Sequence, residues 1–234
     1  MLALRDAPES HRVRPATARK DNNMSFDFNA PLDYDALAKA SEFLKALPPL
    51  PWNLIHPLYF DHLYLHWSVE QFGCLDGAYN AEVDLEADQW VIKITHDPLD
   101  NAVSITNGPY AAHTYHRNSH GFGLAVTGMV GATTDNFGAE GVQNHQLEVL
   151  FAAAGAVCEK YKIDAVGKTK GEYNVMTHAE AAILDGYFPG DGDPDSRWDL
   201  ARLAASDAPL TKVEAIAIGT SIRFRVHKYK GALL

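Results

Sequence analysis

DHLYLHWS (residues 61–68) is the stretch that decides the fold. Leu63 and Leu65 alternate with polar or aromatic residues, and this period of two is typical of a β-strand. Ser68 opens a capping-box pattern, so we expect a short helix or turn directly after the strand. His66 therefore stands at the carboxyl end of a strand, where the sheets of α/β proteins collect ligands and catalytic groups.

Three further segments have the pattern of strands. The spacing of apolar residues predicts strands in AYNAEVDL (78–85) and QWVIKITH (89–96), and a buried, glycine-bounded strand in GFGLAVTGM (121–129). HDPLDNA (96–102) reads as a loop rich in turn residues. All of these predicted strands are short.

Helical spacing of apolar residues appears on both sides of these strands. It predicts helices over 33–47, over 144–162 with Asn144 as N-cap, over 178–185 with a capping box from Thr177 and an end at Gly186, and from 197 to 204. The C-terminal piece SIRFRVHKYKGALL fits either a strand or a helix. Because strands and helices are interleaved along the chain, we expect an α/β fold.

The composition limits the class of protein. The chain has 234 residues, of which 47% are hydrophobic, as expected for one globular domain. Residues 1–23 are expected to be a disordered arm, and residues 24–234 form the domain. The net charge of −10 disfavours a nucleic-acid partner. No apolar stretch approaches the ~20 residues that cross a bilayer, so no membrane insertion is expected.

The N-terminus and the cysteines carry two more expectations. The N-terminus lacks the apolar central region of a secretory signal, so we expect synthesis in the cytoplasm without a signal peptide and delivery by another component. The two cysteines, Cys74 and Cys158, cannot form a disulfide framework or a zinc site built on cysteine pairs. Cys158 lies in a helical apolar pattern and is expected to be a buried thiol.

Histidines are the candidates for chemistry. Of the eleven histidines, His66 ends a predicted strand and His178 opens a predicted helix, which are positions that point side chains into a cleft. A catalytic zinc ion needs three protein ligands and one open position. The chain has no HExxH motif, so spacing alone leaves a metal site and plain structural histidines equally open.

Four blocks, taken in order, carry a resemblance to a known family. They are LYLHWS, AAHTYHRNSHGFGLAVTGM (111–129), the helix 144–162 ending in EKYKID, and VMTHAEAA followed by SRWDL. Together they resemble the type 2 N-acetylmuramoyl-L-alanine amidase family, which includes phage amidase-type lysins and the peptidoglycan recognition proteins. The resemblance covers roughly residues 61–204.

The resemblance implies a fold, an activity and a cofactor. The implied fold is a central mixed β-sheet flanked by helices. The implied activity is zinc-dependent cleavage of peptidoglycan at the amide bond between the muramic-acid lactyl group and L-alanine. The motifs place Zn²⁺ on His66, His178 and Asp199, and the rival for the third ligand is Asp193 in an Asp-Pro pair.

The resemblance also implies roles in catalysis. Tyr79 matches a tyrosine that assists catalysis in the phage-type members. Arg197, two positions before the third ligand, matches a basic residue that stabilises charge on the reacting carbonyl. The family's glutamate in the glycine-rich strand is absent here, so the general-base role falls to Tyr79, to Glu180, or to zinc-activated water alone.

Substrate binding is implied at three further residues. His113 and Asn118 match positions that line the substrate groove of the family. Trp67, or alternatively Trp198, could form an apolar wall beside the metal.

We expect a phage or prophage endolysin, or a bacterial cell-wall lytic enzyme, acting on the wall after release. The alternatives are a non-catalytic peptidoglycan-binding module and a cytoplasmic recycling amidase; the missing glutamate counts against the latter.

Overall fold

A computed structural model describes residues 25–51 and 58–234. The expected arm, residues 1–23, lies outside the described residues, as does part of the proline-rich segment before the first strand. The central sheet has five strands in the order β3-β2-β4-β1-β7. Their bounds are β1 (His62–Trp67), β2 (Ala81–Glu86), β3 (Gln89–Ile94), β4 (Gly121–Val126) and β7 (Val175–Thr177).

The sheet is mixed, as expected. β1 pairs in parallel with β4 on one side and with β7 on the other, and β2 pairs in parallel with β4. β3 runs antiparallel to β2 as the second arm of a hairpin. A separate two-stranded hairpin is formed by β5 (Lys168–Thr169) and β6 (Glu172–Tyr173).

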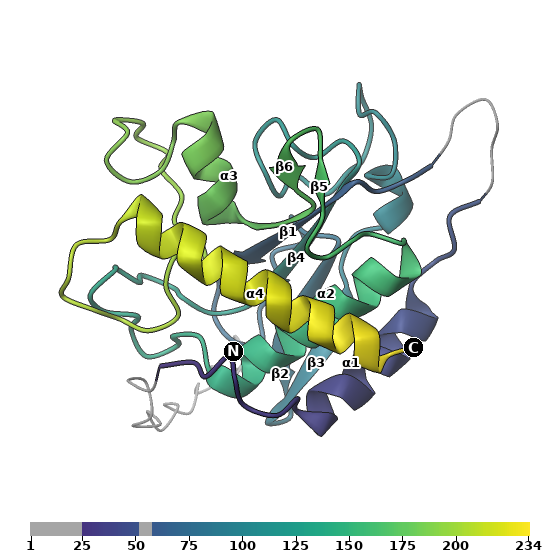
Figure 1. The fold of residues 1–234 in the computed structure, drawn as a ribbon, viewed down its shortest axis with the longest axis horizontal. Coiled ribbons are helices and arrows are strands. Elements are labelled where there is room, and N and C mark those ends of the chain that lie inside the picture. Colours follow the sequence, from purple (N-terminus) through teal and green to yellow (C-terminus); the bar gives the residue numbers. More distant parts are fainter. Residues whose placement is uncertain (1–24, 52–57) are drawn as a thin grey trace, which may run out of the picture.

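Four α-helices accompany the sheet in the described part of the chain: α1 (Tyr34–Ala46), α2 (Asn144–Lys160), α3 (His178–Asp185) and α4 (Lys212–Ala232). α1, α2 and α4 pack side by side over one face of the sheet (Figure 1). α3 lies at the edge of the sheet, against β7 and α4. A short 3₁₀ helix, η1 (Pro98–Asp100), lies in the loop after β3. The α/β class with flanking helices is therefore confirmed.

β1 divides its side chains between the two faces of the sheet. Leu63, Leu65 and Trp67 join the large apolar core under the helices, while Tyr64 belongs to a separate small cluster on the opposite face. His66 shares that opposite face because side chains alternate along a strand. All six residues of β1 are buried, so even the opposite face is covered, by loops and by α3.

Several local expectations are confirmed. Thr177 caps α3 by accepting a hydrogen bond from the Glu180 N–H, and Glu180 completes the capping box. Gly186 ends α3 with φ 82°, a left-handed conformation that suits glycine. Cys158 is a buried free thiol, and burial raises its pKa to about 12.

Two local expectations are wrong, and two that the sequence left open are decided by the structure. The N-cap of α2 is Gln143 and not Asn144. Residues 197–204 form turns and bends and not a helix, and Leu200 within them has a left-handed φ of 58°. Of the short helix or turn expected after Ser68, the structure has the turn, and the Ser68 hydroxyl accepts from the Glu70 N–H at 3.3 Å. The ambiguous C-terminal piece belongs to α4.

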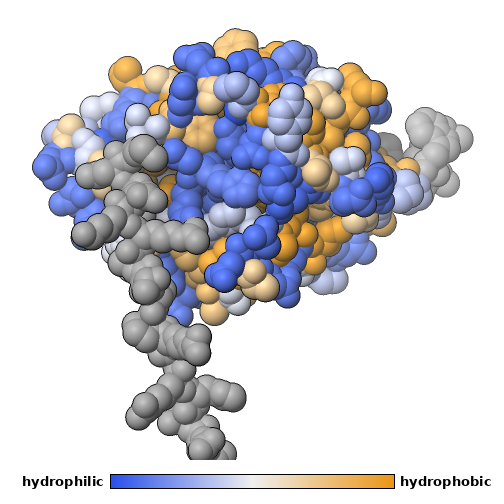
Figure 2. Space-filling view, turned by 90° about the horizontal axis from the view of Figure 1, so that it is seen from below, coloured by the Kyte–Doolittle hydropathy of each residue, from blue (hydrophilic) through white to orange (hydrophobic). Residues whose placement is uncertain are grey.

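The outer surface is of mixed character. Figure 2 shows hydrophilic side chains over much of one face, with hydrophobic side chains scattered among them. No helix in residues 25–51 and 58–234 combines the length and hydrophobicity that a bilayer-crossing segment needs.

Candidate metal centre

Three side chains from distant parts of the chain meet beside the ends of β1 and β7. His66 Nδ1 lies 3.0 Å from His178 Nδ1, and His178 Nδ1 lies 3.1 Å from Asp199 Oδ2. The third side of the triangle, from His66 Nδ1 to Asp199 Oδ2, measures 3.5 Å. All three residues are buried. This group could hold a metal ion.

The fold brings these residues together through neighbouring strands and one backbone bond. β1 and β7 are parallel neighbours, and Leu65 pairs with Thr177 across them. The next residue after each of these two, His66 and His178, therefore lies beside the other. His178 is the first residue of α3, directly after its N-cap. The loop that carries Asp199 is held there because the Asp199 carbonyl accepts from the Ala179 N–H at 3.2 Å.

The triangle has the size that a tetrahedral zinc site needs. Zinc bonds to imidazole nitrogen and carboxylate oxygen are ~2.0–2.2 Å long, which puts neighbouring ligand atoms of a tetrahedron about 3.3–3.6 Å apart. The observed edges of 3.0, 3.1 and 3.5 Å are close to this value. Small outward shifts of the side chains suffice to admit the ion. Three protein ligands also leave the fourth position open.

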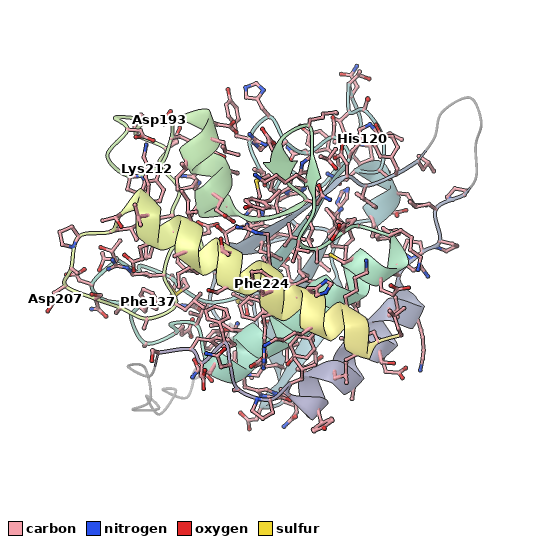
Figure 3. The ribbon with its side chains drawn as sticks, in the orientation of Figure 1. His120, Phe137, Asp193, Asp207, Lys212 and Phe224 are labelled. Atoms are coloured by element: carbon pink, nitrogen blue, oxygen red, sulfur yellow. The ribbon has the colours of Figure 1, made fainter. Side chains whose placement is uncertain are left out.

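Asp199, and not Asp193, completes the group. Asp193 is exposed on the loop beyond α3, where its carboxylate accepts from the Asp195 N–H (Figure 3). Lys212 ties the same loop to the start of α4 by pairing with Asp191 at 2.6 Å. The geometry thus agrees with the preference for Asp199 as third ligand.

Burial and charge leave the ligands in their metal-binding forms. Burial lowers the pKa of His66 to about 4, so its imidazole is neutral near pH 7. Burial also opposes ionisation of Asp199, but the facing His178 and His66 imidazoles outweigh it and hold the pKa of this carboxyl below its usual range. Metal ions bind neutral imidazole and ionised carboxylate, which are the forms that the shifted pKa values favour at His66 and Asp199.

A chain of hydrogen bonds selects the nitrogen of His66 that faces the group. His113 Nε2 lies 3.2 Å from the Gly121 carbonyl, which can only accept, so this nitrogen carries the proton. His113 Nδ1 then accepts from the Thr114 hydroxyl, 2.9 Å away. The Thr114 oxygen in turn accepts from His66 Nε2 at 3.2 Å. The proton of His66 is therefore on Nε2, and the unprotonated Nδ1 points its lone pair toward His178 and Asp199.

The glycines of β4 make room for this hydrogen-bond chain. A Cβ on Gly123 would overlap the His113 ring, and one on Gly121 would lie 3.1 Å from Tyr64 Cε2. Both glycines alternate with core-facing residues, so they present bare backbone to the face of the sheet that carries His66. The glycine-rich strand therefore serves the site by allowing a histidine ring to lie flat against the sheet.

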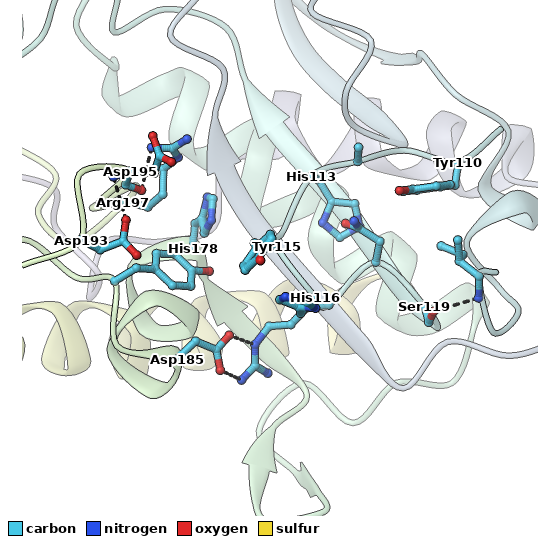
Figure 4. A pocket seen from close by; sticks show the side chains of 15 residues that line it. Tyr110, His113, Tyr115, His116, Ser119, His178, Asp185, Asp193, Asp195 and Arg197 are labelled. Atoms are coloured by element: carbon cyan, nitrogen blue, oxygen red, sulfur yellow. Dashed lines mark hydrogen bonds and ion pairs between the residues drawn. The ribbon is translucent and has the colours of Figure 1, made fainter. Parts of the chain in front are cut away.

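A cavity of about 1250 Å³ opens beside the group. His178 lines it, and so do three residues expected at the site, His113, Asn118 and Arg197. Figure 4 shows Arg197 and His178 toward one end of the cavity and His113 toward the other. Asn118 also supports the hydrogen-bond chain, because its Oδ1 accepts from the Thr114 N–H at 2.9 Å.

Trp67 is not part of this cavity. Its ring packs against Trp198 at 4.7 Å and against Phe137 at 6.1 Å, inside the core on the helix-covered face of the sheet. The structure corrects the expectation of a substrate contact, because alternation along β1 points Trp67 away from the face that His66 occupies.

Glu180 and Tyr79 are engaged elsewhere. The Glu180 carboxylate accepts from the Thr177 N–H at 3.1 Å and from Arg223 Nη1 at 2.8 Å, and it does not line the cavity. The Tyr79 ring lies 5.0 Å from the His66 ring, but its hydroxyl donates to the Trp67 carbonyl at 3.3 Å. Tyr79 lies just before β2, is 8% exposed and does not line the cavity.

Sequence reasoning missed two residues of the site. Thr114 follows His113 directly in a block that was singled out, but nothing in its pattern reveals the bond to His66. Tyr187 lines the cavity after the end of α3, with its ring 6.0 Å from the His178 ring. No pattern in the sequence around Tyr187 indicates that this residue lines a cavity.

Comparison with family models, with curated proteins and with solved structures found no match to the chain. The resemblance of the four sequence blocks therefore remains a prediction.

Proposed function

We propose that the chain is a zinc-dependent hydrolase that cleaves the amide bond between the lactyl group of N-acetylmuramic acid and L-alanine in peptidoglycan. The observation that supports a hydrolase is the triangle of His66, His178 and Asp199 beside a cavity of about 1250 Å³. Two histidines, one carboxylate and an open fourth position are typical of catalytic rather than structural zinc. Peptidoglycan as substrate is supported by the resemblance of the four blocks.

The proposed reaction is a hydrolysis. Water adds to the lactyl carbonyl carbon, the carbon–nitrogen bond to L-alanine breaks, and a proton from the water goes to the leaving nitrogen. The products are a lactyl carboxylate and a free alanine amine. When bound, a zinc ion lowers the pKa of a water ligand to about 7 and polarises a carbonyl oxygen.

Two arginines line the cavity and have different roles in the proposed reaction. Arg197 lines the cavity and anchors its guanidinium through Nη1 on the carbonyls of Asp195 and Ser196, at 2.9 and 3.2 Å. A guanidinium fixed in this way stabilises negative charge on a substrate oxygen without reorganising. Arg117 lines the same cavity, but its guanidinium is paired with Glu172 and Asp185, so it shapes the wall.

The alternative is a peptidoglycan-binding module without activity. Binding alone needs no convergence of three metal-ligand groups in a buried triangle, whereas zinc-dependent hydrolysis does. The activity would suit a phage or prophage endolysin or a bacterial cell-wall lytic enzyme.

The decisive experiment combines metal analysis with wall digestion. We expect about one zinc ion per chain and release of new alanine amino termini from purified sacculi, detected by amine labelling. A chelator abolishes the release and added zinc restores it. His66→Ala and Asp199→Asn lose activity, while the matched variant Asp207→Asn, at an exposed position that does not line the cavity, keeps it. A protein that binds sacculi without releasing amines would be a binding module, and a protein without metal would overturn the proposal.

A further inference from the structure

The hydroxyl of Tyr187 is buried without a partner. Tyr187 is 7% exposed, and its hydroxyl oxygen has no hydrogen-bond partner within residues 25–51 and 58–234. Buried phenols normally find a partner, since an unpaired polar group costs stability. The residue nevertheless lines the cavity beside the metal centre. A partner is therefore expected from whatever fills that cavity.

The backbone of Tyr187 ties it to both sides of the site. Its N–H donates to the Ala182 carbonyl of α3 at 3.0 Å, and its carbonyl accepts from the Arg197 N–H at 3.1 Å. Its ring stands at 76° to the His178 ring. Tyr187 also belongs to an apolar cluster with Phe188 and the alanines Ala179, Ala182, Ala201 and Ala215. Its backbone is thus bonded to α3 and to Arg197, and its ring lies beside the candidate ligand His178.

Tyr79 contrasts with Tyr187 in each of these respects. Both phenols are buried beside a metal-binding histidine. The hydroxyl of Tyr79 already donates to a backbone carbonyl, and the residue does not line the cavity. Of the two, only Tyr187 lines the cavity and has a hydroxyl without a hydrogen-bond partner in the described part of the chain.

We propose that Tyr187 donates a hydrogen bond to the substrate's carbonyl oxygen as that oxygen gains negative charge, and that Tyr79 does not have this role. The inference rests on the proposed hydrolysis. The phenol keeps its proton throughout: the hydrogen bond strengthens while water adds to the carbonyl carbon and weakens when the carbon–nitrogen bond breaks. Burial raises the pKa of Tyr187, with nearby Asp185 adding to the effect, so the hydroxyl remains a donor at neutral pH.

Removing single hydroxyls tests the assignment. Loss of one preorganised donor to a developing oxyanion lowers kcat by ~10²–10³-fold. We expect Tyr187→Phe to lose kcat on this scale with a smaller change in KM. The matched control is Tyr161→Phe, which removes a buried hydroxyl bonded to the Pro48 carbonyl at 3.1 Å. The control keeps kcat. If Tyr79→Phe loses kcat and Tyr187→Phe keeps it, the assignment is overturned.

Thermal stability is a second readout. Tyr161→Phe loses the hydrogen bond from the hydroxyl to the Pro48 carbonyl, so we expect it to lower Tm. Tyr187→Phe removes a buried hydroxyl that has no hydrogen-bond partner among the described residues, so we expect Tm to stay the same or rise. A fall in Tm for Tyr187→Phe as large as that for Tyr161→Phe would show that another group of the protein already bonds this hydroxyl, and would overturn the assignment.

A binding measurement separates this inference from the proposed function. Acetohydroxamate binds metal ions through its carbonyl oxygen and its negatively charged N–O oxygen, and its binding to the cobalt-loaded protein is followed by visible absorption. We expect Tyr187→Phe to weaken this binding roughly tenfold relative to wild type and Tyr161→Phe. Wild type that leaves sacculi uncut overturns the proposed function. Equal affinities for wild type and Tyr187→Phe overturn the role of Tyr187, whether or not sacculi are cut.

Discussion

The hydroxyl of Thr114 decides which nitrogen of His66 carries the proton. It accepts from His66 Nε2 and donates to His113 Nδ1, at 3.2 and 2.9 Å. Outer partners of this kind orient metal-binding histidines and make the ligating nitrogen more basic. We therefore expect Thr114 to raise the affinity of the proposed centre for zinc without touching the ion.

Replacing Thr114 by valine keeps the shape of the side chain and removes both hydrogen bonds. We expect Thr114→Val to weaken zinc binding by ~10–100-fold, measured by competition with a chelating dye. Thr114→Ser retains the hydroxyl and is the matched control, with affinity close to that of wild type. Equal affinities for the valine and serine variants would remove Thr114 from the metal centre.

The buried imidazole of His66 makes stability depend on pH. Its pKa falls from an ordinary 6.5 to about 4 in the folded protein because burial disfavours the charged form. Between these two values the unfolded chain binds the proton and the folded chain does not. Stability is therefore complete above pH 6.5 and declines as the pH falls toward 4, by up to about 1.4 kcal/mol per pH unit from this group.

Thermal melts of the chelator-treated protein between pH 7 and 4 check this dependence. We expect His66→Gln to melt with a shallower dependence on pH than wild type, because the substituted side chain does not titrate. His227→Gln on α4 is the control and keeps the wild-type dependence, since His227 is exposed to water. The same slope in the His66 variant would contradict the assignment.

β4 has two unlike faces. Phe122, Leu124 and Val126 fill the core under the helices. On the other face, Gly123 leaves room for the His113 ring, which a Cβ would overlap. The strand thus supports the fold with one face and the metal centre with the other.

Gly123→Ala tests the close approach. Overpacking of this kind costs ~1–3 kcal/mol in the free energy of unfolding, measured by urea denaturation. The double variant Gly123→Ala/His113→Ala should lose less than the two single variants added together, because the ring that clashes is gone. Gly231→Ala in α4 meets nothing within 4 Å and is expected to stabilise by up to about 1 kcal/mol. Additive losses would mean that the ring moves aside without strain.

Buried ion pairs connect α4 to two other helices. Arg225 pairs with Glu148 of α2 at 2.5 Å, and Arg223 pairs with Glu180 of α3 at 2.8 Å. The second pair fixes the helix whose first residue is the ligand His178. The C-terminal helix thereby positions a metal ligand without contributing one.

Removing Arg223 would leave the Glu180 carboxylate buried without its charge partner. Arg223→Met should destabilise the protein by ~3–5 kcal/mol, and Arg223→Met/Glu180→Met should recover most of this loss. Calorimetry measures both. We expect the folded double variant to keep kcat on sacculi, because Glu180 acts through α3 and not on substrate. Loss of kcat in a folded double variant would return Glu180 to the catalytic group.

The sequence by itself determined the features that depend on neighbouring residues. The strand around His66, the Thr177 cap and the Gly186 stop each follow from a few adjacent side chains, and each is present. The expected helix over 197–204 failed because a contact distant in the chain, from the Ala179 N–H to the Asp199 carbonyl, holds that segment in turns.

Only the tertiary structure decided which residues share the site. Three features depend on how strands and loops are juxtaposed: Asp199 rather than Asp193 completes the triangle, Trp67 lies in the core, and Tyr187 lines the cavity with its hydroxyl unpaired among the described residues. Local periodicity and capping act over a few residues, so they cannot specify contacts between side chains that lie far apart in the chain.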